Sequence, residues 1–301
     1  MTDQRDFLTW TPKKATDAAC RFYDQHARDM QHAAAANLTF EEYERLLSGV
    51  GAAFSEIAPD GPEALFPELY KRRDRMREIV DLITPASAEL GLTRCVENFL
   101  CYVADIITET LIARPQLLKT QEQVSLEEVL EHESIEGFIS WAAERRVAQL
   151  SFKGLEEIAQ YIKKRLGLEL HQEEVDWLKL KKGVALRNLI VHRRGIIDQR
   201  FIYTTGQKDL AKGSAYKTTM RDYVRTAESA MKIVGEFDVK VASKFSITQR
   251  STEGEKWYNP GRWGPEGKQK QQKLTEAAGS EPHSPSRTRE EPRETTEADR
   301  A

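Results

Sequence analysis

Arg187, Asn188 and His192 form a group whose residue types and spacing suit chemistry on a phosphate ester. A guanidinium offers a fixed fork of donors for a phosphate, and an imidazole titrates near neutral pH and can accept or donate a proton. In principle the pair suffices to cleave RNA without a metal, by activating the ribose 2′-hydroxyl against its own phosphate. Five helical residues turn the chain by about 500° and advance it about 7.5 Å, so Arg187 and His192 would point about 140° apart. We expect them to converge only beside the helix end, in a groove between two helices, or between two subunits.

Basic residues surround this group, and no acidic residue occurs between Trp177 and Ile197, a stretch called here the basic segment. Removing its six positive charges from the formal net charge of −3 leaves −9 for the remainder. Such a local excess favours a phosphate-binding face on an otherwise acidic protein. The alternative is a solvated cationic helix end that only complements the helix dipole. The predicted RNA-binding residues are Lys179, Lys181, Lys182, Arg193 and Arg194.

The string Arg187-Asn188-Leu189-Ile190-Val191-His192 resembles the signature of the HEPN superfamily, an R-x4-6-H motif near the end of a helix in an all-α bundle. The family often has a polar residue directly after the arginine, as here. The flanking run Ile-Val-His-Arg-Arg-Gly-Ile-Ile-Asp (190–198) is similar to the "IVHNxGIVD" run of the RiboL-PSP-HEPN group. Segments 115–119, 124–130 and 163–168 also look like segments of that group, in the same order. The resemblance covers about residues 93–240.

The resemblance implies a bundle of about four or five core helices, usually a homodimer, in which two motifs face each other across the subunit interface. It also implies a metal-independent endoribonuclease acting on single-stranded RNA, in a toxin–antitoxin, abortive-infection or other phage-defence system, with an antitoxin or sensor as a further partner. His192 would then be the general acid/base, Arg187 would hold the scissile phosphate, and Asn188 would orient the substrate or the imidazole.

Two positions depart from the pattern of the group. Arg193 directly follows the histidine, where related sequences often have Asn, so contacts to the substrate or to the helix cap should differ. Arg194 stands where HEPN toxins silenced by a nucleotidyltransferase have a tyrosine. We therefore do not expect control by AMP addition at that position.

Two other classes of function compete with a nuclease. A catalytically inactive HEPN-like dimer would bind protein or RNA without cutting, with His192 capping its helix and Arg187 forming a salt bridge. A structural helical adaptor would instead use the aromatic run 257–263 as a docking peptide, so deletion of 251–301 would abolish partner capture.

Helical periodicity dominates the chain before residue 251 and predicts an all-α fold. The clearest helix is expected behind Thr93 as N-cap and ends at Pro115. Ser125, Ser134 and Ser151 precede three short helical patterns. Other helices are expected over 12–34, 39–58 with Thr39 as cap, 62–84, about 171–192 ended by Gly195, and 214–236, with a short extended turn at 196–204.

Three regions are expected along the chain. Pro85 to Gly91 interrupt the helical periodicity and predict a boundary between an N-terminal helical extension, 1–90, and a HEPN-like helical bundle, 91–250. Residues 251–301 contain few large apolar residues among prolines and charges, which predicts a disordered tail. Its aromatic run 257–263 is either a docking motif or a strap on the bundle.

The composition of the 301-residue chain, with 40% hydrophobic and 31% charged residues, excludes collagen-like and wholly disordered proteins. The net charge excludes a uniformly basic coat protein. The most apolar stretch, Phe99 to Ile107, is far shorter than the roughly 18–20 residues that cross a bilayer, so no membrane partner is expected. With no secretory signal pattern at the N-terminus and no C-x-x-C spacing among three cysteines, we expect a cytoplasmic protein without disulfides, metal or cofactor. His26 and His32, about 240° apart on a helix, are expected to be surface histidines rather than metal ligands.

Overall fold

The computed structural model describes residues 12–54, 57, 60–119, 124–151 and 153–252. In these ranges the regular structure is helical, except for one pair of two-residue strands and an isolated bridge. The predicted all-α class is therefore confirmed for the described part of the chain. None of the helices in these ranges has both the length and the apolar composition needed to cross a membrane. The aromatic run 257–263 lies outside the described residues.

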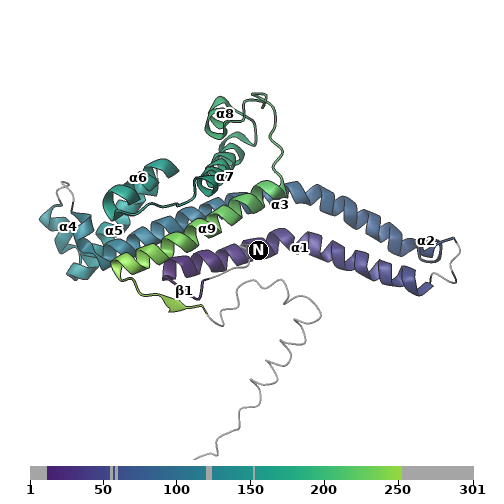
Figure 1. Cartoon of the computed structure of the whole chain (residues 1–301), viewed down its shortest axis with the longest axis horizontal. Helices are drawn as coiled ribbons and strands as arrows, with labels where there is room; N and C mark the ends of the chain where they lie inside the picture. Colours follow the sequence, from purple (N-terminus) through teal and green to yellow (C-terminus); the bar gives the residue numbers. More distant parts are fainter. Residues whose placement is uncertain (1–11, 55–56, 58–59, 120–123, 152, 253–301) are drawn as a thin grey trace, which may run out of the picture. The chain divides into compact units, whose positions relative to one another are not determined.

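Two long helices, α1 (Asp17–Phe54) and α3 (Pro67–Ala113), lie side by side and are connected through the short helix α2 (Pro62–Leu65) (Figure 1). The expected division of both long helices is wrong, since each is continuous. Thr39 and Thr93, the two expected caps, lie inside α1 and α3. The Thr39 hydroxyl donates to the carbonyl of Ala35 at 2.8 Å, a bond that is compatible with a continuing helix.

The expected break at Pro85 to Gly91 is also wrong, because α3 continues through both residues. Pro85 cannot donate to the carbonyl of Asp81, but both residues are exposed, so water can bond that carbonyl. Gly91 is buried against Tyr223 of α9 (Met220–Phe245), and a Cβ at this glycine would lie 2.8 Å from the tyrosine ring. Gly91 therefore permits a close helix contact and does not end a helix, so no helix end marks the expected boundary at residue 90.

The hydrophobic core is built mainly by α1, α3, α7 (Glu174–Arg193) and α9. Its largest fully buried side chains include Phe22 of α1, Phe99 and Tyr102 of α3, and Phe237 of α9. The first turns of α1, assigned by sequence to the N-terminal extension, thus share one core with residues assigned to the bundle. His26 is buried with them, contrary to its expected place at the surface.

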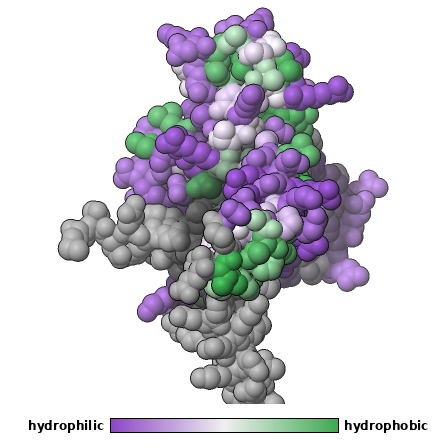
Figure 2. Space-filling view, turned by 90° about the vertical axis from the view of Figure 1, so that its right-hand side faces the viewer, coloured by the Kyte–Doolittle hydropathy of each residue, from purple (hydrophilic) through white to green (hydrophobic). Residues whose placement is uncertain are grey.

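The end of the α1–α3 hairpin extends away from this core. Figure 2 looks onto that end and shows apolar side chains gathered there amid hydrophilic neighbours. Ile57 and Leu65 at this end keep 66% and 46% of their surface exposed. The hairpin end therefore contributes little to the buried core.

The N-terminal end of α1 is held by a buried carboxylate of α9. Thr16 donates its amide to Asp238 Oδ2 at 3.1 Å and its hydroxyl to Asp238 Oδ1 at 2.5 Å. Burial raises the pKa of Asp238, and the two bonds from Thr16 oppose that rise. Beside this contact, β1 (Lys14–Ala15) pairs antiparallel with β2 (Arg250–Ser251), so Ser251, the first residue of the predicted tail, lies in a strand.

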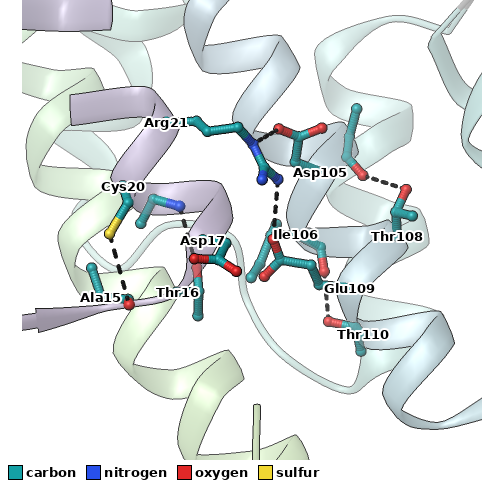
Figure 3. Close-up of polar contacts among 12 residues, drawn as sticks. Ala15, Thr16, Asp17, Cys20, Arg21, Asp105, Ile106, Thr108, Glu109 and Thr110 are labelled. Atoms are coloured by element: carbon teal, nitrogen blue, oxygen red, sulfur yellow. Dashed lines mark hydrogen bonds and ion pairs between the residues drawn. The ribbon is translucent and has the colours of Figure 1, made fainter. Parts of the chain in front are cut away.

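A second polar contact fixes α1 against α3 (Figure 3). Arg21 donates through Nε to Asp105 at 2.9 Å and through Nη2 to Glu109 at 3.1 Å. Burial raises the pKa of Glu109, although Arg21 opposes that rise. Because the guanidinium is more than half exposed, we expect this contact to set the register of the helices more than their stability.

The shorter elements between α3 and α9 begin at η1 (Pro115–Leu118) and α4 (Leu126–Leu130), followed by α5 (Ile135–Ser151), α6 (Leu155–Leu166) and α8 (Gln199–Thr205). Ser125 forms the expected capping box with Glu128, and Ser134 accepts the amide of Gly137 at 3.0 Å. Ser151 was wrongly expected to begin a helix, since it ends α5.

The segments around α8 and α9 also differ from expectation. Within the expected extended turn at 196–204, only Ile196 forms a bridge, to Ala215, and a helix begins at Gln199. The last long helix begins later than expected, behind the capping box of Thr219 and Asp222, and continues to Phe245.

Candidate functional site

Helix α7 carries the predicted motif and ends directly after it. Arg194 adopts the left-handed conformation with φ 54°, and Gly195 follows with φ 77°. Their amides donate to the carbonyls of Ile190 and Leu189 at 3.0 and 3.1 Å, and the bond from Arg194 closes the helix end as in the αL motif. The predicted stop at Gly195 is confirmed, and it leaves His192 exposed in the last turn.

Asn188 and His192 line one cavity of about 530 Å³, called here the His192 cavity. They are four residues apart and therefore lie on the same side of α7. Helices α6 and α8 supply the other walls, and the apolar floor includes Leu155 and Phe201. The charged residues of the lining are Glu156, Glu157, Lys181, Arg193, Asp198 and Arg200.

Arg187 points to a different side of α7, toward α3. Its Nη2 group forms an ion pair with Glu97, and its Nη1 group donates to Asn188 Oδ1 at 2.9 Å. Arg187 and His192 therefore point to different sides of the helix, as the spacing predicts. They do not meet in a groove within this chain. Arg187 instead acts on Asn188: with Oδ1 occupied, the NH2 group of Asn188 is the part of the amide left to donate in the His192 cavity.

Carboxylates pair with most cations of the basic segment in the folded chain. Asp176 and Asp198 directly flank the segment in sequence, whereas Glu156 comes from α6 and Asp222 from α9. The contacts are Lys179–Asp176 at 3.4 Å, Lys181–Glu156 at 2.5 Å, Lys182–Asp222 at 3.4 Å and Arg193–Asp198 at 3.8 Å. Within the described part of the chain, Arg194 forms no such pair.

The predicted RNA-binding residues also point in several directions. Only Lys181 and Arg193 line the His192 cavity. Lys182 lies 5.9 Å from the ring centre of Tyr216, whose pKa is raised by burial and by Asp222. Lys179 shares Asp176 with Lys232, and the hydrogen bond from Lys232 to that carboxylate raises the pKa of Lys232.

Several residues of the site are not predicted by the sequence motif. Arg200 and Thr204 enter the His192 cavity from α8, whose N-cap Asp198 accepts the amide of Phe201 at 2.8 Å. An Asp followed by a short helical segment was the available signal for α8. Glu97, the partner of Arg187, lies 90 residues away in sequence and has no local signal.

In the described ranges, no group of three or more His, Cys, Asp or Glu side chains is arranged to hold a metal ion. No set of metal ligands is therefore identified among the described residues that line the His192 cavity.

The pair of Arg187 and Glu97 should contribute little to stability, because their side chains keep 23% and 45% of their surface exposed. In a double-mutant cycle with Arg187→Gln and Glu97→Gln, we expect a coupling free energy of about 0.5–1 kcal/mol from urea unfolding. Arg45 and Glu42, a more exposed pair on α1, provide the matched control and should couple less. Equal coupling in both pairs would show that the Glu97 contact does not hold Arg187 in place.

Comparisons of the chain with protein-family models, with curated proteins and with solved structures found no match.

Proposed function

We propose that this protein is a metal-independent endoribonuclease that cuts single-stranded RNA, with His192 transferring the proton. The observation that carries the proposal is the shared cavity: the His192 imidazole, the Asn188 amide and the cations Lys181, Arg193 and Arg200 line one solvent-accessible space. Its volume of about 530 Å³ lies in the range that holds a ligand the size of a nucleotide.

The chemistry follows from these groups. A neutral His192 would accept the proton of a ribose 2′-hydroxyl, whose oxygen attacks the adjacent phosphorus. The bond from phosphorus to the 5′-oxygen breaks, which leaves a 2′,3′-cyclic phosphate on one product and a 5′-hydroxyl on the other. The NH2 group of Asn188 and the nearby cations would stabilise the negative charge that develops on the phosphoryl oxygens.

Arg187 has a different role in this proposal from the one that the sequence resemblance implies. Because its guanidinium contacts Glu97 and Asn188, it acts as a positioning residue for the Asn188 amide. A homodimer, which the resemblance implies, would bring a second His192 to the site, and that imidazole would give a proton to the leaving 5′-oxygen.

The second candidate is a HEPN-like dimer that binds RNA or a protein without cutting it. The ion pairs of the basic segment favour the protein-binding form of this alternative, because carboxylates already occupy the cations that a phosphate would need. RNA would then have to displace Glu156 from Lys181, and Asp198 from Arg193.

His192→Ala is expected to reduce cleavage of a mixed cellular RNA pool in EDTA by at least about 100-fold, since a general acid–base group contributes about that much or more. Asn188→Ala and Arg187→Ala should also reduce cleavage. The product ends are tested for 2′,3′-cyclic phosphate. His132→Ala removes an imidazole outside the cavity and serves as the matched control.

Retained cleavage in His192→Ala would contradict the proposed role of this residue. If the folded wild-type protein binds RNA but leaves it intact in EDTA, the binding module is the better description. RNA binding by either form should weaken steeply with salt, because phosphate contacts release counterions.

A further inference from the structure

A second cavity, of about 440 Å³, lies between α1 and α3, and it shares no residue with the His192 cavity. We call it the Arg94 cavity. Its polar lining consists of Gln25, Arg28, Asp29 and His32 from α1, with Ser87 and Arg94 from α3. The nuclease proposal uses none of these residues.

A buried carboxylate orients the arginine on the α3 side. Asp29 Oδ1 accepts from Arg94 Nε at 2.6 Å and from Gln25 Nε2 at 2.8 Å, and the Asp29 side chain is only 6% exposed. Because Nε is occupied, the two terminal amino groups of the Arg94 guanidinium remain to donate to a ligand. Its side chain is 47% exposed, so those groups are accessible to a ligand.

The α1 side presents two further nitrogen donors. Arg28 and His32 lie four residues apart, so they are neighbours on one face of α1. Arg28 forms an ion pair with Asp24 but keeps 68% of its side chain exposed, and His32 is exposed. Each arginine is paired with an aspartate, Arg94 with Asp29 and Arg28 with Asp24, so a ligand anion would compete with Asp24 for the exposed Arg28.

We propose that the Arg94 cavity binds the phosphate group of a small phosphomonoester, such as a nucleoside or sugar phosphate. A phosphate dianion has oxygens in tetrahedral directions, so it can meet Arg94 on one wall and Arg28 with His32 on the other. A planar carboxylate would satisfy only one fork of donors. The cavity is larger than one phosphate, and the exposed side chain of Leu90 offers apolar surface for the organic part.

Calorimetric titration of the full chain with adenosine monophosphate, ribose 5-phosphate, inorganic phosphate and adenosine tests this proposal. We expect the two phosphomonoesters to bind more tightly than inorganic phosphate and adenosine not to bind. Arg28→Ala and Arg94→Ala should each weaken binding by at least about tenfold, which is the effect of losing one charge-assisted contact. Arg72→Ala removes an equal charge from an exposed position of α3 outside the cavity and should change affinity less than about twofold.

Arg28→Ala is the decisive variant, because Arg94→Ala leaves the buried Asp29 without its cation and could unfold the chain. Circular dichroism melting identifies that failure. An equal loss in Arg72→Ala would mean diffuse electrostatic attraction and would overturn the proposal. If neither ester binds at about 10 mM, the proposal is also overturned, because this concentration exceeds the dissociation constant of even a weak specific site, about 1 mM. His192→Ala should bind the esters like wild type, so this test and the nuclease test fail independently.

Discussion

Gly183→Val should lower the free energy of unfolding by more than about 3 kcal/mol, because no space exists for a side chain where α7 crosses α9. A Cβ at Gly183 would lie 2.3 Å from Thr226 Cγ2 and 2.6 Å from Thr226 Oγ1. Thr226 cannot easily turn aside, since it is buried and its hydroxyl donates to the carbonyl of Asp222 at 2.8 Å. The helices must therefore separate, and α7 would move together with Asn188 and His192.

Gly183→Ala should show the same effect on a smaller scale. Overpacking costs about 1–3 kcal/mol, and the better helix propensity of alanine returns up to about 1 kcal/mol of that. Gly49→Ala in α1 is the matched control: no atom lies within 4 Å of its added Cβ, so this variant should be slightly stabilised.

Chemical unfolding in urea measures these differences. Thr226→Ala removes the two closest atoms and should restore much of the stability lost in Gly183→Ala when the two changes are combined. Equal stability of Gly183→Ala and Gly49→Ala would show that α7 and α9 are not in contact as described.

Asp238→Ala should cost about 2–4 kcal/mol, because it leaves the buried amide and hydroxyl of Thr16 without an acceptor. Asp238 is 1% exposed and joins the start of α1 to α9. Asp209→Ala, which removes an exposed carboxylate, should have almost no effect and controls for the change in net charge.

The stabilisation by Asp238 should also depend on pH, in a direction opposite to that of most aspartates. Its pKa is raised in the folded state by burial, so the folded protein binds the proton more tightly than the unfolded chain does. The advantage of wild type over Asp238→Asn is therefore largest below the ordinary aspartate pKa of about 4 and decreases as pH rises through the raised pKa. Urea midpoints of both proteins across this range provide the measurement. An advantage that grows with pH would mean that the bonds from Thr16 dominate and lower the pKa instead.

Local signals predicted helix ends where the capping contact is itself local. Ser125 with Glu128, and Gly195 after the last turn of α7, are two such cases. The same reasoning failed at Thr39, Thr93 and Pro85, because a threonine can lie inside a helix and an exposed proline interrupts only one hydrogen bond. The long packing surface between α1 and α3 keeps these helices continuous, and a pattern read over a few residues does not contain that information.

For the candidate site too, the sequence predicts geometry along one helix but not contacts between helices. Helical spacing correctly predicted that Arg187 and His192 diverge, since both lie on one regular helix. The partners of the cations could not be predicted in this way. Glu97 and Glu156 come from other helices, and only the fold brings them to Arg187 and Lys181. A segment without acids in sequence is therefore a poor measure of local charge in a helical bundle.

The pairing of β1 with β2 has a consequence for whatever flanks the helical core. The amide of Thr252 donates to the carbonyl of Lys13 at 3.0 Å, so two positions almost 240 residues apart are neighbours on the surface. The chain between them nearly closes on itself, as in a ring. A binding element joined before residue 12 and another joined after residue 252 would start from one point, and each would raise the effective concentration of the other at a shared target.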